Sequence, residues 1–135
     1  MVNGSTEAAR VIRRLVGVYD ADGSVRGELR YFVGARFGRR HCALCDITHR
    51  LVRERPEWKA WRQSLPVSFE TFHRDDQPDE LRHAYGGRLP VVLAEIDARL
   101  VELLSAGDLL RCKSSLADFI VSVNVAALRA GLVWE

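Results

Sequence analysis

The sequence predicts a single α/β domain, on the evidence of its size, its composition and the order of its apolar segments. The chain has 135 residues, of which 47% are hydrophobic and 28% charged. This is enough apolar material for one core, and too short a chain for a second catalytic module. No repeat, low-complexity tract or Gly/Ser-rich linker divides residues 1–135. The apolar segments follow the order β, β, α, β, α, β, β, α, which favours an α/β fold in one domain.

Two strand-like segments come first. Residues 11–19 and 25–37 are rich in β-branched and aromatic side chains, and the Asp-Ala-Asp-Gly sequence at 20–23 is typical of a turn. We expect a hairpin or two consecutive strands, and we interpret Asp20 as a turn residue. A helix is the competing interpretation for 25–37, because its apolar residues also fit a helical spacing.

A helix is expected over residues 42–65. Apolar residues recur at helical spacing before Pro56 and resume after it, namely Leu44, Ile47, Leu51, Trp58, Trp61 and Leu65. Since proline interrupts a helix, we expect a kink or a restart at that position.

The second half of the chain alternates between strands and helices. Residues 67–72 alternate as in a strand, and 78–85 form a short helix that Gly86 and Gly87 end. The apolar runs 89–96 and 100–104 are expected to pair as antiparallel strands. Ser115, with Asp118 three residues later, is typical of the start of a helix, here the closing helix.

Charge and hydropathy exclude some classes of partner. Lys and Arg total 20 against 18 Asp and Glu, and the two signs are mixed along the chain, which predicts no nucleic-acid partner. No apolar run approaches the roughly 18 residues that span a bilayer, and no secretory signal is evident. We therefore expect a cytoplasmic protein without a membrane partner.

The cysteines provide the main functional signal. Cys42 and Cys45 are three residues apart, where a strand-like segment gives way to a helix. Backbone N–H groups in the first turn of a helix stabilise a thiolate, so Cys42 is expected to be the attacking sulfur. Cys45, one turn later and more covered, is then expected to be the resolving sulfur. We interpret the lone Cys112 as a buried apolar residue outside the site.

From about residue 31 to 125 this arrangement resembles the thioredoxin family, through Cys-x-x-Cys at the start of a helix and Leu89-Pro90 before a strand pair. The resemblance implies a thioredoxin-like mixed sheet with helices on both faces. It places the core fold at 30–128, and 1–29 becomes an amino-terminal extension that adds a strand or hairpin. It also implies that Pro90 is cis, faces the dithiol and, with Leu89, holds the substrate.

The resemblance implies thiol–disulfide exchange with a protein or small-molecule substrate, a reaction that needs no cofactor. His41 stands where the family usually has tryptophan, and a histidinium there would favour the Cys42 thiolate. Leu44 replaces the family's proline. The buried acid that thioredoxins use as a proton relay has no counterpart beside the nearby arginines, Arg36, Arg39 and Arg40.

Two other functions fit the same residues. On a continuous helix Cys42, Cys45 and His49 would point to one side and could bind Zn or Cu, with His41 as a candidate fourth ligand. The domain could instead be a non-catalytic module that binds a partner beside Pro90.

Overall fold

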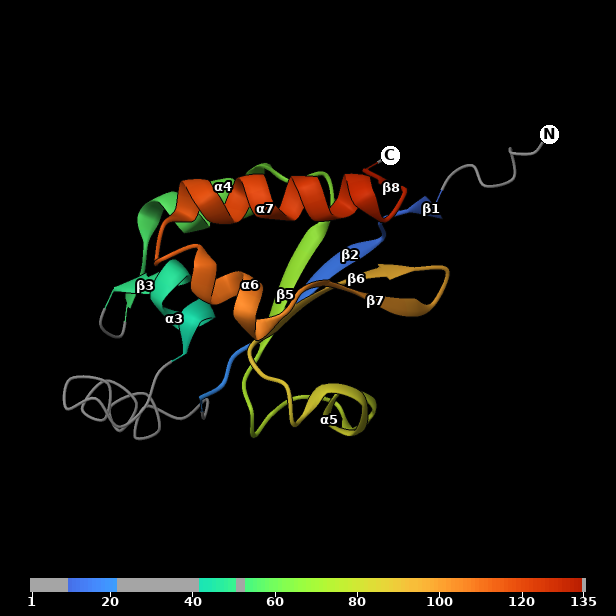
Figure 1. Ribbon diagram of the computed structural model, residues 1–135, viewed down its shortest axis with the longest axis horizontal. Helices are drawn as coiled ribbons and strands as arrows, with labels where there is room; N and C mark the ends of the chain where they lie inside the picture. The colour runs from blue at the N-terminus through green and yellow to red at the C-terminus, as the bar shows by residue number, and fades with distance from the viewer. Residues whose placement is uncertain (1–9, 22–41, 51–52, 135) are drawn as a thin grey trace.

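The computed structural model describes residues 10–21, 42–50 and 53–134, which form a mixed α/β fold (Figure 1). The helices and strands follow one another in the order β1 (Arg10–Val11), β2 (Arg14–Val18), α3 (Ala43–Thr48), β3 (His49–Arg50), β4 (Arg53–Glu54), α4 (Pro56–Ser64), β5 (Ser68–Phe72), α5 (Asp79–Tyr85), β6 (Val91–Ile96), β7 (Arg99–Leu104), α6 (Ala106–Arg111), α7 (Leu116–Arg129) and β8 (Leu132–Val133). Among these elements, no helix is long and apolar enough to cross a membrane.

The main sheet is mixed and has the strand order β5-β2-β6-β7. Strand β2 pairs in parallel with β5 and antiparallel with β6, and β6 continues antiparallel to β7. Asp97 and Ala98 connect β6 to β7 with positive φ angles of 48° and 63°. The α/β class, the mixed sheet and the antiparallel pairing of the last two long strands are therefore confirmed.

Strand β2 lies inside the sheet, which corrects the expected position of the amino-terminal residues. Its segment 14–18 was assigned to an extension outside the core, yet it has β5 on one side and β6 on the other. Residues 15–18 are all buried, as expected for a strand covered on both faces. The strand expected at 25–37 lies outside the described residues.

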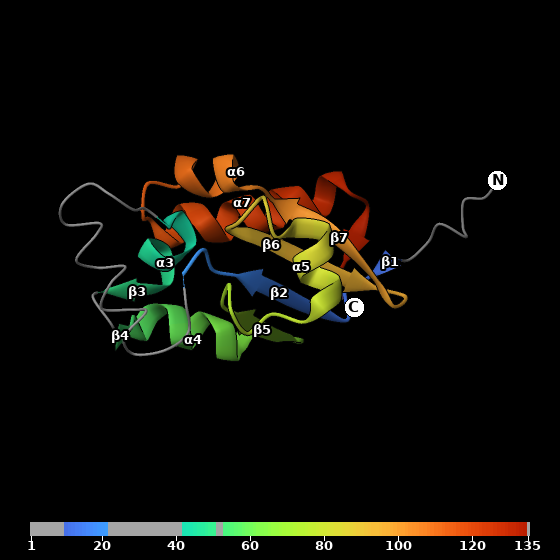
Figure 2. The same ribbon diagram turned by 90° about the horizontal axis from the view of Figure 1, so that it is seen from below.

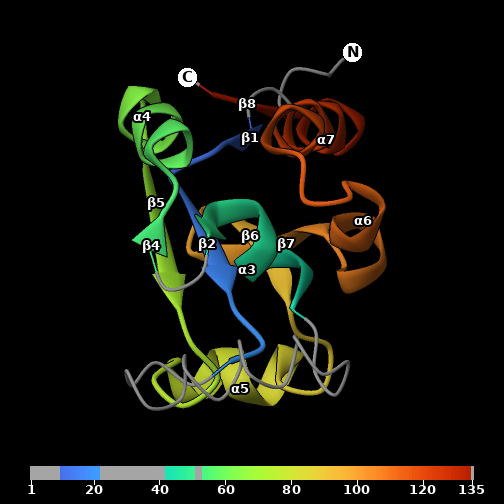
Figure 3. The same ribbon diagram turned by 90° about the vertical axis from the view of Figure 1, so that its left-hand side faces the viewer.

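Helices cover both faces of the sheet (Figure 3). On one face, Trp58 of α4 and Phe119 of α7 pack in a cluster with Phe69 of β5. On the other face, Leu81 of α5 packs against Val16 and other side chains of β2 and β6. Figure 2 shows α5 in front of the sheet and α7 behind it, with α6 to one side, next to the edge strand β7. The alternation of side chains along β2 and β6 therefore supplies two separate hydrophobic clusters.

The segment expected as one interrupted helix contains two helices with short strands between them. Helix α4 begins at Pro56, so the predicted restart is confirmed. Helix α3 already ends at Thr48, and the backbone of His49 is extended, with φ −127° and ψ 154°. The pairing of β3 with β4 then precedes α4. Leu51, which was expected to extend the first helical stripe, lies outside the described residues.

The later helices agree with their sequence signals, with one addition. Helix α5 begins after Pro78 and ends before Gly86, and the hydroxyl of Ser115 accepts a hydrogen bond from the backbone N–H of Asp118 at the start of α7. The additional helix is α6, in which Ser105 and Asp108 form a reciprocal capping box.

Candidate functional site

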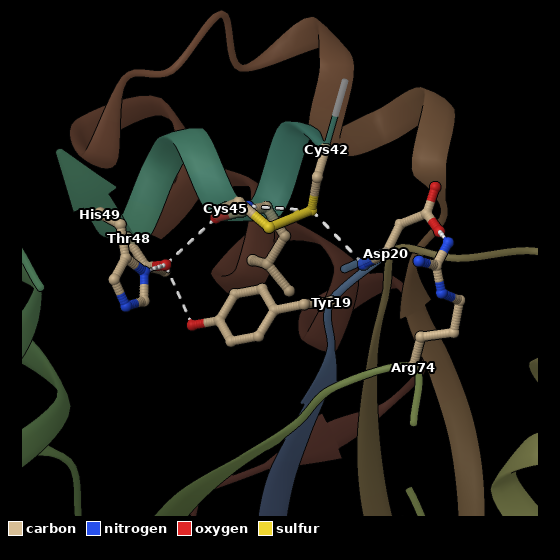
Figure 4. The surroundings of a disulfide bond; sticks show 8 residues. Tyr19, Asp20, Cys42, Cys45, Thr48, His49 and Arg74 are labelled. Atoms are coloured by element: carbon tan, nitrogen blue, oxygen red, sulfur yellow. Dashed lines mark hydrogen bonds and ion pairs between the residues drawn. A yellow bond between two sulfur atoms is a disulfide. The ribbon is translucent and has the colours of Figure 1, made fainter. Parts of the chain in front are cut away.

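Cys42 and Cys45 form a disulfide at the beginning of α3 (Figure 4). Their Cα atoms are 5.3 Å apart, within the usual range for a disulfide. Cys42 is the N-cap of α3, with an extended backbone, and Cys45 lies in the first turn. The expected pair is thus joined where the helix begins.

Two backbone N–H groups point at the sulfur of Cys42. The N–H of Cys45 lies 3.3 Å from Cys42 Sγ, and the N–H of Asp20 lies 3.4 Å from it. The first donor belongs to α3, and the second follows the end of β2. Because hydrogen bonds from N–H groups stabilise a charged acceptor more than a neutral one, this arrangement favours a thiolate at Cys42 once the disulfide is reduced.

Both cysteines are buried, and their relative exposure differs from the expectation. Cys42 has 0% of its surface exposed and Cys45 has 7%. The prediction that Cys45 would be the more covered of the two is therefore wrong for the disulfide form. Attack on either sulfur needs space along the S–S axis, so exchange with a substrate requires local opening around the disulfide.

Helix α3 packs closely on the sheet beneath the disulfide because β2 has a glycine there. A Cβ atom at Gly17 would lie 3.1 Å from the ring of Phe69 and 3.3 Å from the side chain of Leu44. Leu44 is fully buried and lies between the two cysteines. Gly17 therefore leaves room for the side chain of Leu44.

Tyr19 lies beside the disulfide and joins a short polar network (Figure 4). Its hydroxyl is 3.0 Å from Thr48 Oγ1, and Thr48 in turn donates to the carbonyl of Leu44 at 3.2 Å. The same Thr48 oxygen is 2.7 Å from Nδ1 of His49. Burial of the side chain raises the pKa of Tyr19 to about 12, although the hydrogen bond with Thr48 acts in the opposite direction.

This pKa predicts a loss of stability at high pH. Tyr19 holds its proton more tightly in the folded protein than in the unfolded chain, where a tyrosine titrates at about 10. The stabilisation is therefore fully present below pH of about 10 and is lost as the pH rises toward the folded pKa of about 12. We expect a loss of about 2–3 kcal/mol from this group. Urea unfolding measures this loss as the difference in unfolding free energy between about pH 9 and about pH 11.5, which cover most of the transition.

The matched variants separate Tyr19 from the other groups that titrate at high pH. Tyr19→Phe removes the ionisable group, so its stability should fall less between the two pH values than that of the unsubstituted protein. Tyr85→Phe, on α5, should behave like the unsubstituted protein. An equal fall in the two variants would contradict the assignment to Tyr19.

The turn after β5 holds the segment that follows β2. Arg74 Nη1 lies 3.4 Å from the carboxylate of Asp20, and the backbone N–H of Arg74 donates to the carbonyl of Ala21 at 2.9 Å. His73 packs its ring against that of Tyr19, with 5.2 Å between the centroids. The residues next to Cys42 are therefore fixed by residues distant in sequence.

Pro90 lies at the same edge of the sheet as Cys42. The Leu89–Pro90 peptide bond is cis, as expected. Val91, the next residue, pairs with Val18 at the end of β2, two residues before the Asp20 N–H that contacts Cys42. Pro90 is buried and Leu89 is partly buried.

The residues of the metal interpretation are not arranged as expected. His49 follows the end of α3, so it does not continue the helical face of Cys45. Within 10–21, 42–50 and 53–134, no group of three or more His, Cys, Asp and Glu side chains is arranged to hold a metal ion. His41 lies outside the described residues.

Cys112 is a separate, buried thiol. Burial raises its pKa, and its Sγ lies 3.6 Å from the carbonyl oxygen of Asp108, to which it donates. It lines a cavity of about 630 Å³ between α6, α7 and β7, and neither Cys42 nor Cys45 is among the lining residues. Cys112 therefore has the properties of a structural thiol in a region distinct from the disulfide.

Sequence reasoning missed four neighbours of the disulfide, which are Tyr19, Asp20, Thr48 and Arg74. Thr48 was detectable, since it is one helical turn after Cys45. Asp20 had only a turn signal. Tyr19 and Arg74 carried no local signal, because strand pairing brings them to the site.

Comparison of the chain with protein-family models, with curated proteins and with solved structures finds no match.

Proposed function

We propose that this protein is a thiol–disulfide oxidoreductase with a thioredoxin-like fold, in which Cys42 and Cys45 are the redox pair. The observation that carries the proposal is the disulfide at the start of α3, where two backbone N–H groups contact the sulfur of Cys42. These donors stabilise the thiolate that such a reaction requires.

The arrangement of the sheet supports the thioredoxin-like assignment. The disulfide follows β2, an interior strand, and the cis Pro90 precedes β6, the antiparallel neighbour of β2. The cysteine pair and the proline thus belong to adjacent strand ends. In the proposed reaction, Leu89 and Pro90 form the wall of the substrate groove, and His41 acts on the thiolate as a neighbouring positive charge.

The reaction begins with the reduced protein. The thiolate of Cys42 attacks one sulfur of a substrate disulfide, so that a mixed disulfide forms and the other substrate sulfur leaves as a thiolate. Cys45 then loses its proton and attacks Cys42 Sγ. The Cys42–Cys45 bond forms, the mixed disulfide breaks, and the second substrate sulfur leaves. Two electrons have then passed from the dithiol to the substrate, whose two thiolates take up protons.

The substrate class is a protein or small-molecule disulfide, and no organic cofactor takes part. An external thiol must return the Cys42–Cys45 disulfide to the dithiol after each cycle. Because both sulfurs are buried, the substrate sulfur must enter as the protein opens locally around the disulfide.

A turnover assay tests the proposal. With dithiothreitol as the reductant, the full chain should reduce insulin disulfides at a rate at least about tenfold above that of dithiothreitol alone, since a thiolate at Cys42 attacks faster than an ordinary thiol. Cys112→Ser should retain that rate, because Cys112 lies outside the redox pair. A rate equal to that of dithiothreitol alone would refute the proposal.

The two alternatives lack an observation of their own. A Zn or Cu site would need Cys42 and Cys45 in the reduced form and the His49 ring turned toward them. Here the two sulfurs form a disulfide, and the His49 ring is hydrogen-bonded to the hydroxyl of Thr48. A non-catalytic module needs a partner surface beside Pro90, and the cavity described above lies elsewhere.

A further inference from the structure

We propose that Arg74 is a positioning residue for the Cys42 sulfur, because it holds the backbone N–H of Asp20 toward that atom. The inference rests on the proposed function and adds a residue to it. Arg74 lies after β5 and, among the described residues, contacts the segment that follows β2. Its role would therefore be indirect.

Contacts on both sides of the Asp20 N–H fix its direction. Before it, the N–H of Tyr19 donates to the carbonyl of Phe72 at 2.8 Å, and after it the carbonyl of Ala21 accepts from Arg74 at 2.9 Å. The backbone thus has one anchor on each side of Asp20. The third anchor lies between these two and is the ion pair between the carboxylate of Asp20 and the guanidinium of Arg74, 3.4 Å apart.

The turn that carries Arg74 is itself ordered from within. Gln77 is buried, and its side-chain amide donates to the carbonyl of Arg74 at 3.1 Å. The carboxylate of Asp76 accepts from the backbone N–H of His73. Arg74 therefore extends from a fixed turn, so it can hold a loop in place.

The side chain of Arg74 has a second effect on the same sulfur. A carboxylate near a thiolate disfavours the negative charge, and the guanidinium partner offsets that charge at Asp20. Loss of the Arg74 side chain would leave the two backbone anchors in place but remove the third, so that the Asp20 N–H is held less firmly toward the sulfur and the carboxylate loses this partner. Both consequences destabilise the thiolate, so an experiment must separate position from charge.

The experiment follows the alkylation of Cys42 against pH. Full-length protein with Cys45→Ser and Cys112→Ser leaves one thiol, which reacts with iodoacetamide as its thiolate. We expect Arg74→Ala to raise the midpoint of the rate profile by about 0.5–1 pH unit, which lowers the rate below the midpoint by about threefold to tenfold. Arg74→Lys, which keeps the charge but not the planar guanidinium, should recover part of the loss.

The double variant Arg74→Ala/Asp20→Asn distinguishes position from charge. It keeps the backbone N–H of residue 20 and removes both charges. If Arg74 positions that N–H, the midpoint of the double variant stays above that of the parent protein. If the two midpoints are equal, charge alone explains the effect and the positioning role is overturned.

Two further results separate this inference from the proposed function. A low midpoint in the parent protein that Arg74→Ala leaves unchanged would overturn the inference and leave the proposed function intact. A parent midpoint at about 8.5, the value of an ordinary thiol, would contradict an activated Cys42 and overturn both proposals.

Arg99→Ala is the control variant, because Arg99 is an exposed arginine at the far end of the sheet, and its midpoint should match that of the parent protein. Thermal unfolding of each variant verifies that it is folded.

Discussion

Replacement of Cys42 by serine is expected to reduce insulin turnover to the background rate of the reductant, whereas replacement of Cys45 by serine should stop the reaction after its first exchange. Without Cys42, the sulfur that receives the two N–H groups is lost. Without Cys45, the mixed disulfide on Cys42 has no neighbouring thiol to resolve it. Mass spectrometry of each variant after incubation with oxidised glutathione should find a stable adduct in Cys45→Ser only.

Cys112→Ser, combined with each variant, removes the remaining thiol as a source of adducts. The opposite pattern, with an adduct on Cys45 in Cys42→Ser and none in Cys45→Ser, would contradict the assigned roles. That pattern is a real alternative, because Cys45 is the slightly more exposed of the two sulfurs.

Trp58→Ala is expected to lower the free energy of unfolding by about 3–5 kcal/mol, a large part of the stability of a small domain. Trp58 is fully buried, and its ring lies 5.1 Å from that of Phe69 and 6.1 Å from that of Phe119. Its indole N–H also donates to Glu54 at 3.0 Å. Alanine would leave a cavity between α4, β5 and α7 and remove that hydrogen bond. Urea denaturation followed by circular dichroism measures the loss.

Trp61→Ala is the matched control, since Trp61 is on the same helix and in the same aromatic cluster but only partly buried. It should cost clearly less than Trp58→Ala. Equal losses, or a loss below about 1 kcal/mol for Trp58→Ala, would mean that the core does not depend on this ring.

Local patterns predicted most of the elements. Proline at position 56, the Gly86-Gly87 pair and the Ser115 cap each mark a helix boundary that the structure contains. Helix α6 was missed although Ser105 and Asp108 have the spacing of a cap, because its six residues are too few for a periodic apolar stripe. The early end of α3 was missed because the apolar spacing continues past Thr48.

In the candidate site, too, the residues with a local sequence signal were predicted and those that strand pairing brings together were not. Cys42, Cys45 and the cis bond before Pro90 were predicted from short sequence signals, and the structure contains both the disulfide and the cis bond. Arg74 and Tyr19 reach the disulfide through the pairing of β2 with β5 and β6, which joins segments more than fifty positions apart. A single sequence carries little information on such pairing, and for the same reason the interior position of β2 was not foreseen.

The interior position of β2 also has a consequence for biosynthesis. The strand is synthesised before both of its partners, and one of them, β6, ends at residue 96, where Glu95 pairs with Arg14. Cotranslational folding therefore cannot complete the sheet until β6 has left the ribosome. Until then the apolar side chains of Leu15, Val16 and Val18 lack the neighbours that bury them. The nascent chain therefore exposes an apolar segment of the kind that chaperones bind.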